Sequence, residues 1–371
     1  MVDKGPTYSF DVEWYDPIAT MIKTYKLIYH TGINSVEMHD EKSNKLFLKP
    51  TKVDDLKLSD LYPGSSVTIL SRTLRVIGFG DNFTRRALVG NSERCIAFVR
   101  PDAVCQAGKV LALLEEKGFR LVNLKMIYPT TEEVMELFEE SINYTQSPQL
   151  LTELSQKVMI GVELMCNNAC SLIREIVSTK RSGDESFVAN AELFVTAKNP
   201  EMAARQAQKI FGSPGGPKFR GLPRLKGTTL AIVKPHAVAA GMLGTIWSEI
   251  QSRGFCVTAA RLFRLSKLDA AEFLEVYKGV AHEYPEMLDQ LASGPCVALE
   301  IANTGENTER DVQQGFREFV GPLDPEIARF LRPDTLRAKY GVDKVRNAIH
   351  CTDLPDDAEI EVNYFFRTMD K

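Results

Sequence analysis

Residues 230–238 read L-A-I-V-K-P-H-A-V, and residues 96–104 read I-A-F-V-R-P-D-A-V. In both stretches four apolar residues precede a basic residue and a proline, a pattern typical of a buried strand that turns into a helix. A glycine follows in each copy, Gly108 in one and Gly244 in the other. Matched elements in the same order indicate two homologous domains within one chain.

The repeat divides the chain into four parts. Residues 91–212 form the first copy and residues 228–371 the second. Residues 213–227 join them, with three prolines, four glycines and four basic residues, which is typical of an extended and irregular segment. We expect this linker to be solvated, although its basic charge would also suit an acidic partner. Residues 1–90 read as short strands separated by turn residues, which indicates a small β-rich module.

Each copy alternates candidate strands and helices, most clearly the second. Its expected strands are residues 229–233, 255–265 and 296–301, and its expected helices are residues 243–253, 268–277, 285–292 and 311–320. Residues 321–335 follow as a long loop rich in helix breakers, and such a loop inside a compact domain is usually functional. Residues 359–366 alternate like a strand, but a helix fits them as well.

The composition excludes several classes of protein. A length of 371 residues with 44% hydrophobic and 25% charged residues fits a soluble globular protein of two or three domains. The net charge of -4 gives no general attraction to nucleic acid or anionic membranes. We expect no transmembrane helix, because no apolar run is long enough, and no signal peptide. The seven cysteines include no C-x-x-C pair, so we expect a reducing, cytoplasmic setting without disulfides or zinc.

One histidine stands among phosphate-type donors near the C-terminus. His350 is one of five histidines in the chain, and Arg337 and Asn347 precede it. A neutral imidazole is nucleophilic near pH 7, and the arginine fork matches two phosphate oxygens at once. The combination favours a phosphoryl relay, whereas a histidine with a purely structural role is the alternative.

Five ordered motifs in the second copy resemble those of the nucleoside diphosphate kinases. They are A-I-V-K-P at residues 231–235, S-G-P at 293–295, R-E-F-V-G-P at 317–322, R-P-D-T-L-R at 332–337 and N-A-I-H at 347–350. The resemblance implies an α+β fold class. We expect a small N-terminal β-rich, PH-like domain followed by two ferredoxin-like α/β sandwiches, each an antiparallel four-stranded sheet covered by helices.

The resemblance also implies an activity and a site. The family moves a γ-phosphate from a nucleoside triphosphate such as ATP to a diphosphate through phosphohistidine. His350 would be the phosphoryl acceptor and Glu361 the carboxylate that orients it, with Lys234 on the ribose and phosphates as the third catalytic residue. The implied nucleotide-binding residues are Lys234, Tyr277 (supporting the lysine), Tyr284 (stacking on the base), Arg317 and Arg337 (on phosphates) and Asn347 (on the ribose). Mg²⁺ would bridge the nucleotide phosphates, and no residue is implied as a metal ligand.

The second copy departs from the family pattern at three positions. Leu323 stands where a phosphate-binding threonine is usual, so one donor is lost and slower turnover is expected. His236 replaces an aspartate, and we interpret it as a helix-start residue rather than a second catalytic histidine. Cys351 replaces a glycine.

The first copy departs much further. It contains no histidine, and alignment places Val195 at the nucleophile position and Glu192 at that of the ribose-binding asparagine. Arg100 replaces the lysine, and Arg174 is the candidate for a retained phosphate arginine. A phosphohistidine mechanism is therefore impossible in this copy. We expect it to be a structural partner that mimics the second half of a dimer, which predicts a monomer in solution.

The order of a β module followed by an altered and an intact kinase copy resembles ciliary members of this family. Residues 13–17 (E-W-Y-D-P) and 36–40 (V-E-M-H-D) resemble their DM-ten domain. This implies a place in the cytoskeleton of the cilium or flagellum, in the axoneme inside doublet microtubules. The implied partners are tubulin, other axonemal proteins, γ-tubulin complexes and nucleotides, with no membrane or nucleic acid. A structural connector with a vestigial site is the alternative to an enzyme, and a free metabolic kinase is a third possibility.

Overall fold

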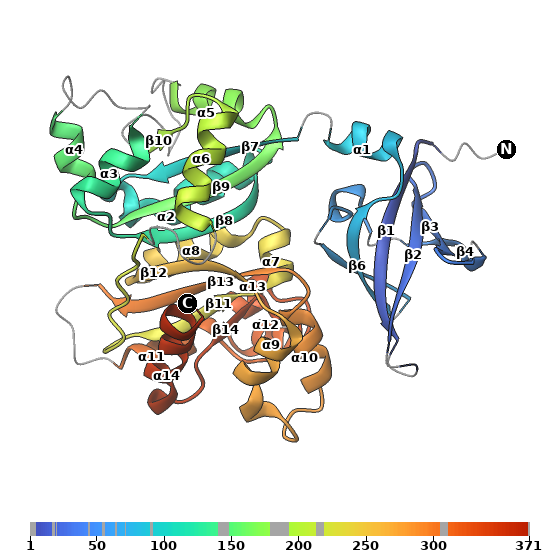
Figure 1. Ribbon diagram of the computed structural model, residues 1–371. Coiled ribbons are helices and arrows are strands. Elements are labelled where there is room, and N and C mark those ends of the chain that lie inside the picture. Colours follow the sequence, from blue (N-terminus) through green and yellow to red (C-terminus); the bar gives the residue numbers. More distant parts are fainter. Residues whose placement is uncertain are drawn as a thin grey trace. The chain divides into compact units, whose positions relative to one another are not determined.

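The computed structural model describes residues 5–369 except 17–18, 20, 44, 54–55, 64, 71, 90–91, 140–147, 179–192, 213–218 and 305–310. The chain divides into two compact units (Figure 1). One contains Met1–Ser92 with Leu291–Gly294, and the other contains Glu93–Gln290 with Pro295–Lys371. Within the described ranges, every helix falls short of the length and apolarity needed to cross a membrane.

The N-terminal unit is built on a six-stranded sheet in the order β4-β3-β2-β1-β6-β5. Its strands are β1 (Thr7–Asp16), β2 (Met21–His30), β3 (Ser35–Asp40), β4 (Leu46–Lys52), β5 (Ser66–Ile69) and β6 (Arg72–Phe79), and the paired neighbours are antiparallel. Alternate residues such as Phe10, Val12, Leu27 and Leu74 form its core. The expected β-rich module is therefore present, and its PH-like character stays a prediction.

Two elements add detail to the β-rich module. Trp14 lies inside β1 and packs against the core of this unit, near Tyr25 and Phe47. A short helix, α1 (Asn82–Val89), follows β6. The pattern of short strands in residues 1–90 did not predict this helix, because periodicity is a weak guide over so few residues.

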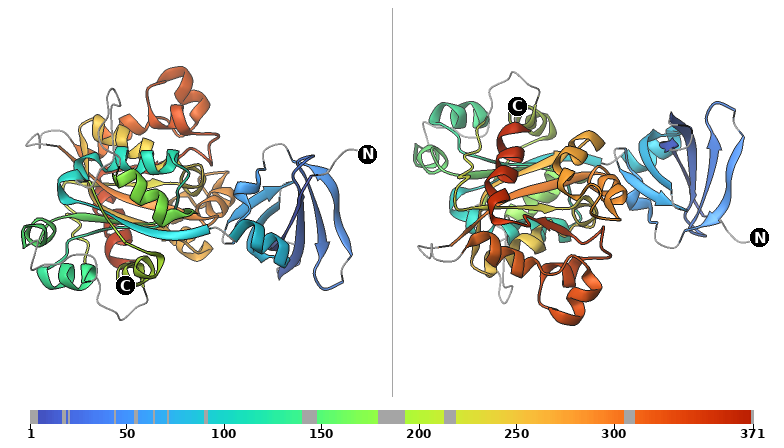
Figure 2. Two further views of the ribbon diagram at one scale, coloured as in Figure 1. Left: turned by 90° about the horizontal axis from the view of Figure 1, so that it is seen from above. Right: turned by 90° about the horizontal axis from the view of Figure 1, so that it is seen from below.

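The second unit contains one eight-stranded sheet that runs through both sequence copies (Figures 1 and 2). The first copy supplies β7 (Ser92–Val99), β8 (Arg120–Ile127), β9 (Met159–Asn167) and β10 (Phe194–Thr196). The second supplies β11 (Thr229–Val233), β12 (Phe255–Arg264), β13 (Pro295–Asn303) and β14 (Ile349–Cys351). The sheet order is β10-β7-β9-β8-β12-β13-β11-β14. When the four strands of each copy are numbered from 1 to 4 in chain order, their order in the sheet is 4-1-3-2 in the first copy and the reverse in the second. This is the order expected for a ferredoxin-like domain.

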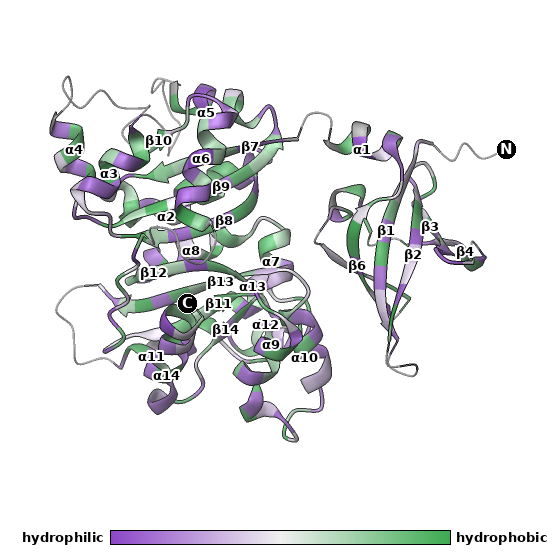
Figure 3. Cartoon of the chain, viewed as in Figure 1, coloured by the Kyte–Doolittle hydropathy of each residue, from purple (hydrophilic) through white to green (hydrophobic). Residues whose placement is uncertain are grey.

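The helices of this unit follow the strands in both copies. The first copy has α2 (Ala107–Glu116), α3 (Thr131–Phe138), α4 (Pro148–Leu154), α5 (Ala169–Ser178) and α6 (Pro200–Phe211). The second has α7 (Pro235–Ala239), α8 (Leu243–Ser252), α9 (Lys267–Phe273), α10 (Tyr284–Leu291), α11 (Val312–Val320), α12 (Pro325–Leu331), α13 (Leu336–Tyr340) and α14 (Ala358–Asn363). Figure 3 shows that hydrophobic residues predominate along the central strands that these helices cover, in line with the burial of β11 and β13.

In two segments of the second copy the structure differs from what the sequence pattern suggests most simply. Residues 321–335 are not a continuous loop, because α12 begins after Asp324, whose side chain accepts from Glu326 N, and Pro325 occupies its first position. Residues 359–366 take the helical alternative, α14 followed by a π-helical turn. Val362 and Phe365 are buried at helical spacing, and this burial outweighs the strand-like alternation.

The strand register agrees with the alignment of the two copies. His350 on β14 lies opposite Ile232 on β11, and Val195 on β10 lies opposite Phe98 on β7. Ile232 and Phe98 occupy the same position of the repeated motif. Val195 therefore has the place in the first copy that His350 has in the second.

The two copies meet at the centre of the sheet and at one pair of helices. Arg261 of β12 pairs with Lys125 of β8, and α2 packs on α8 beside this junction (Figure 1). A Cβ atom added to Gly244 would lie 1.9 Å from Ala112 N, and one added to Gly108 would lie 2.2 Å from Ser248 N. Only glycine allows this approach of the two backbones.

Each of these helices also caps the other. Glu115 Oε2 accepts from Gly244 N at 2.8 Å near the start of α8, and Gln251 Oε1 accepts from Gly108 N at 3.1 Å near the start of α2. The two side chains occupy equivalent places in the two copies, but one is a carboxyl group and the other an amide. Burial raises the pKa of Glu115 to about 7, although the hydrogen bonds from the α8 backbone oppose this.

Most residues of the described linker, 219–227, are exposed or partly exposed, as expected of a solvated segment, but the linker is also anchored to both copies. Phe219 is fully buried, and Arg220 O accepts from Tyr128 N at 2.8 Å. The buried carboxylate of Glu300 accepts from Arg224 N at 3.0 Å and from Leu225 N at 2.6 Å. A buried charge requires such donors, so Glu300 and the linker hold each other in place.

Gly244→Ala tests the contact between the two helices. The added methyl group has no room beside Ala112, so we expect a loss of about 2–3 kcal/mol in the free energy of unfolding, measured by urea titration. Gly315→Ala in α11 is the matched control, since its Cβ would meet only Phe255 at 3.9 Å. That change should stabilise by about 0.5–1 kcal/mol through helix propensity. Equal effects of the two substitutions would contradict the close approach.

Glu115→Gln tests the buried carboxyl group. Because the folded pKa of Glu115 is raised above its unfolded value, its contribution to stability is full below about pH 4.5 and is lost as the pH rises through 7. We expect this to make up roughly 1–3 kcal/mol of the change in unfolding free energy between pH 5 and pH 8, and Glu115→Gln to remove it. Glu116→Gln, one residue further along α2, should leave the pH dependence as it is. The interpretation fails if both variants keep the wild-type slope.

Candidate active site

The centre of the site is a histidine held by a carboxylate. His350 lies on β14 and is 8% exposed, and its Nε2 is 3.2 Å from Glu361 Oε2 on α14. Thr352 Oγ1 donates to the same carboxylate oxygen at 2.8 Å. An ionised carboxylate only accepts hydrogen bonds, so the neutral ring carries its proton on Nε2 and keeps a lone pair on Nδ1.

Packing fixes the plane of this imidazole. Phe273 at the end of α9 meets the His350 ring edge-on, with 5.1 Å between ring centroids. Phe273 in turn packs on Phe365 from the C-terminal helical segment. Sequence reasoning missed Phe273, because an aromatic residue at a helix end carries no signal for such a role.

Lys234 lies where β11 ends and α7 begins. It is 8% exposed, and its Nζ donates to Val345 O at 2.9 Å. Burial, together with the nearby charge of Arg337, lowers the pKa of Lys234 to about 7. Among the described residues no carboxylate forms an ion pair with Lys234, and a buried ammonium of this kind fits a site that receives an anion.

Arg317 and Tyr277 meet at one carboxylate. The Arg317 guanidinium on α11 is 3.4 Å from Asp353 Oδ1, and the Tyr277 hydroxyl donates to Asp353 Oδ2. Tyr277 was expected to support Lys234, but its hydrogen-bond partner is Asp353. Asp353 therefore holds the predicted phosphate-binding arginine while no nucleotide competes for it.

Arg337 and Asn347 are both buried and bound to the backbone. Arg337 Nη1 donates to Gly321 O at 2.9 Å, and its Nε donates to Ile349 O at 3.1 Å. Asn347 Nδ2 donates to Leu323 O at 3.1 Å and to Lys344 O at 3.0 Å. Among the described residues its Oδ1 has no hydrogen-bond partner, although the side chain is fully buried. An unpaired buried acceptor suits a hydroxyl donor from a ligand.

Tyr284 and His236, the two remaining residues discussed from the sequence, lie at the edge of this group. Tyr284 begins α10, and no hydrogen bond or ring contact joins it to the other predicted site residues in the part of the chain that the structure describes. Its neighbour Glu283 is 3.8 Å from Lys344, which brings the start of α10 to the loop before Asn347. His236 lies in the first turn of α7, as a helix-start residue should.

The corresponding place in the first copy has a different chemistry. Arg100, which replaces Lys234, is paired with Glu153 on α4 at 2.5 Å. Arg174 donates from Nε to Cys170 O within its own helix at 2.9 Å. Val195, at the place of the histidine, offers no nucleophile at that position, and Glu192 lies outside the described residues.

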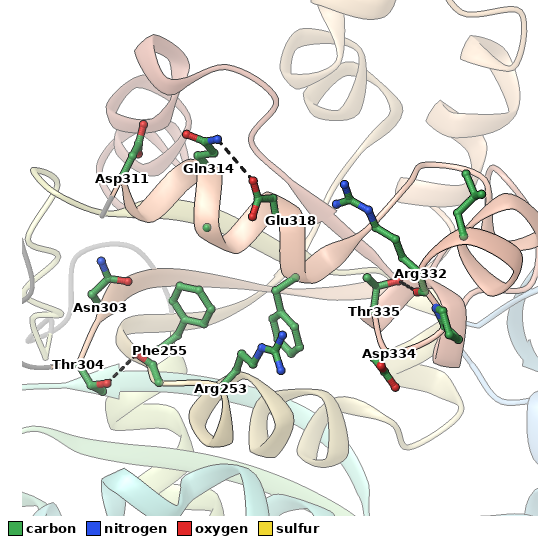
Figure 4. A pocket seen from close by; sticks show the side chains of 15 residues that line it. Arg253, Phe255, Asn303, Thr304, Asp311, Gln314, Glu318, Arg332, Asp334 and Thr335 are labelled. Atoms are coloured by element: carbon green, nitrogen blue, oxygen red, sulfur yellow. Dashed lines mark hydrogen bonds between the residues drawn. The ribbon is translucent and has the colours of Figure 1, made fainter. Parts of the chain in front are cut away.

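A separate pocket lies beside α11 and contains none of the predicted catalytic residues. It has a volume of about 700 Å³ and is lined on the α11 side by Gln314, Gly315 and Glu318. Figure 4 shows Arg253 and Arg332 on its other walls. Arg317 lies on another face of α11, where it pairs with Asp353. This pocket is therefore distinct from the histidine site.

The comparisons with known proteins identify the family of the chain. The nucleoside diphosphate kinase family model matches residues 93–189 and 227–370. The chain therefore belongs to the nucleoside diphosphate kinase family. Within it, the chain is 38% identical over 380 residues to a mouse protein named nucleoside diphosphate kinase homolog 7, with 99% of this chain and 95% of the mouse protein covered. A rat protein of the same name is 37% identical over the same shares.

A single-copy relative matches a smaller part of the chain. A crystal structure of the Aquifex aeolicus nucleoside diphosphate kinase is 35% identical, covers 38% of this chain and 96% of its own, and has a TM-score of 0.35. The family makes this chain a kinase-type transferase that acts on nucleotides with a divalent metal. The described residues contain no cluster of three or more His, Cys, Asp or Glu side chains that could hold a metal.

Lys234 gives a test of nucleotide binding that does not depend on turnover. Phosphate oxygens beside the ammonium should raise its pKa from about 7, so ADP binding at pH 8 should take up close to one proton and much less at pH 6. Calorimetry in buffers of different ionisation enthalpy measures this uptake. Lys234→Met should abolish it, whereas Lys226→Met on the exposed linker should keep it. Binding without proton uptake at pH 8 would show that Lys234 does not face the phosphates.

Proposed function

We propose that the second copy transfers the γ-phosphate of a nucleoside triphosphate to a nucleoside diphosphate through phospho-His350. One observation carries the proposal, namely the hydrogen bond from His350 Nε2 to Glu361. It leaves the Nδ1 lone pair as the nucleophile and stabilises the positive charge that develops on the ring.

The transfer follows in two balanced steps. The Nδ1 lone pair forms a bond to the γ-phosphorus while the bond from that phosphorus to the bridging β-oxygen breaks, and the diphosphate leaves. A second diphosphate then uses a β-phosphate oxygen to take the phosphoryl group from Nδ1, which regenerates the neutral imidazole. The proton stays on His350 Nε2 throughout, donated to Glu361, so the ring does not have to turn.

The remaining residues bind and orient the nucleotide. Lys234, Arg317 and Arg337 face the phosphates and stabilise the charge of the transferring group, and Asn347 accepts from a ribose hydroxyl. Tyr284 would stack on the base. Mg²⁺ bound with the nucleotide would neutralise phosphate charge, and no protein cluster is needed to hold it.

Two features favour slow turnover. Leu323 is 53% exposed and offers only its main-chain oxygen where a threonine would donate to phosphate. One hydrogen bond to a charged group contributes about 1.5–3 kcal/mol, equivalent to roughly a tenfold to hundredfold change in rate. In addition, Arg317 must either leave Asp353 to bind the phosphates or bind the carboxylate and the phosphates at once.

The second candidate function is structural, and the first copy favours it. Arg100 is neutralised by Glu153 and the linker is anchored, so residues 91–212 are suited to support the active copy rather than to bind nucleotide. We further propose that the chain is an axonemal protein on doublet microtubules, with tubulin, other axonemal proteins and γ-tubulin complexes as partners. This rests on the resemblance of residues 1–90 to DM-ten domains.

Incubation of the full chain with γ-labelled ATP and Mg²⁺ tests the enzyme proposal. We expect an acid-labile, alkali-stable label that added diphosphate discharges, because phosphohistidine is a transferable intermediate. His350→Ala should carry no label. His282→Ala, which removes an exposed histidine of the same copy, should be labelled like the wild type. A folded wild-type chain that takes up no label would leave the structural function as the better account.

A further inference from the structure

One peptide beside the catalytic histidine has an unusual backbone conformation. Ala348 is fully buried and has a φ of +69°, in the left-handed region that L-residues with a Cβ atom avoid. It lies between Asn347 and His350, which face the nucleotide in the proposed reaction. Such a conformation persists only when neighbouring groups hold it.

Lys234 and His236, two residues apart in one turn, restrain this conformation. Ala348 O accepts from Lys234 N at 2.9 Å, and Ala348 N donates to Nε2 of His236 at 3.3 Å. Lys234 precedes α7 and His236 lies in its first turn, so both polar groups of the strained residue are bound to the same rigid element. The proposed mechanism gives His236 no role.

The second ring nitrogen of His236 is also engaged. Its Nδ1 lies 2.9 Å from Nε2 of the Gln290 side-chain amide on α10. A neutral imidazole carries a proton on one nitrogen only, so Nδ1 cannot accept from Gln290 while Nε2 accepts from Ala348. Turning the Gln290 amide by 180°, which exchanges its oxygen and nitrogen, lets Oε1 accept from Nδ1–H and leaves Nε2 as the acceptor for Ala348. The ring is therefore fixed at both nitrogens, in the tautomer that the Ala348 hydrogen bond requires.

The surrounding charges keep this ring neutral. Burial lowers the pKa of His236 to about 4, and Lys234 and Arg346 act in the same direction. Asp343 and the backbone of Arg346 act in the opposite direction, and Gln290 on α10 is uncharged. The Nε2 acceptor is therefore available throughout the neutral pH range.

From these contacts we infer that His236 is a positioning residue of the phosphotransfer site. Its Nε2 holds the Ala348 peptide, and this sets the directions of the Asn347 and His350 side chains. The inference rests on the proposed function of His350.

Two variants remove the acceptor and one restores it. His236→Ala deletes the ring, His236→Phe keeps a planar ring without nitrogen, and His236→Asp supplies a carboxylate oxygen. We expect the first two to lower the rate of labelling at saturating ATP at least tenfold and to weaken ADP binding about tenfold. His236→Asp should recover most of both losses. His282→Ala serves as the control.

Hydrogen exchange gives a readout that does not depend on catalysis. The Ala348 amide, followed by NMR or mass spectrometry of a peptide covering residues 347–352, should exchange at least tenfold faster in His236→Phe than in the wild type and His236→Asp. Exchange at the wild-type rate in His236→Phe overturns the inference. So does faster exchange with unchanged labelling and unchanged ADP affinity, because the peptide would then position nothing.

The outcomes also separate this inference from the proposed function. If the wild type takes up no label, the phosphotransfer proposal fails, and ADP affinity and exchange still decide the role of His236. Weaker ADP binding with recovery in His236→Asp supports the inference in that case, and unchanged binding overturns it. If His236→Ala does not fold, the comparison of His236→Phe with His236→Asp carries the test.

Discussion

The short pairing of β14 with β11 is the constraint on which the site depends. β11 is buried along its whole length between β13 and β14, and His350 lies opposite Ile232 in that pairing. His350 itself is on the edge strand β14, which this one pairing holds to the sheet, so further contacts are needed to orient the imidazole. Glu361 and Thr352 provide them on one side of the ring, and Phe273 provides them on another.

The same scaffold is present twice, but the candidate catalytic side chains lie in one copy. In the first copy the equivalent strand pairing carries Val195, and the carboxylate of Glu153 pairs with the arginine at the position of Lys234. The described residues of that copy still form a packed core, and its helix α2 packs on α8 of the second copy. The two copies therefore share a fold while they differ in the side chains at one site, which agrees with the view that function resides in sites placed on folds.

Sequence patterns predicted the duplicated architecture, most strands and helices of the second copy, and a group of residues that the structure largely brings together. Periodic burial and the repeated motif are local signals that survive into the fold. The misses share a different cause. The φ of Ala348, the bond from Tyr277 to Asp353 and the anchoring of the linker by Glu300 depend on residues far apart in the chain. α12 was missed for another reason, because its Asp324-Pro325 start signal was read as part of a loop.

The anchored linker has a consequence for how the two copies stay together. Two separate chains that meet through a helix pair and a strand edge come apart on dilution, because their association is bimolecular. Here the two copies belong to one chain, so their association is intramolecular, and the linker contacts at Phe219 and Glu300 hold them close at any dilution. The second copy therefore keeps its partner copy however scarce the protein is. A defect in the packing of the first copy would act on the second copy of the same molecule.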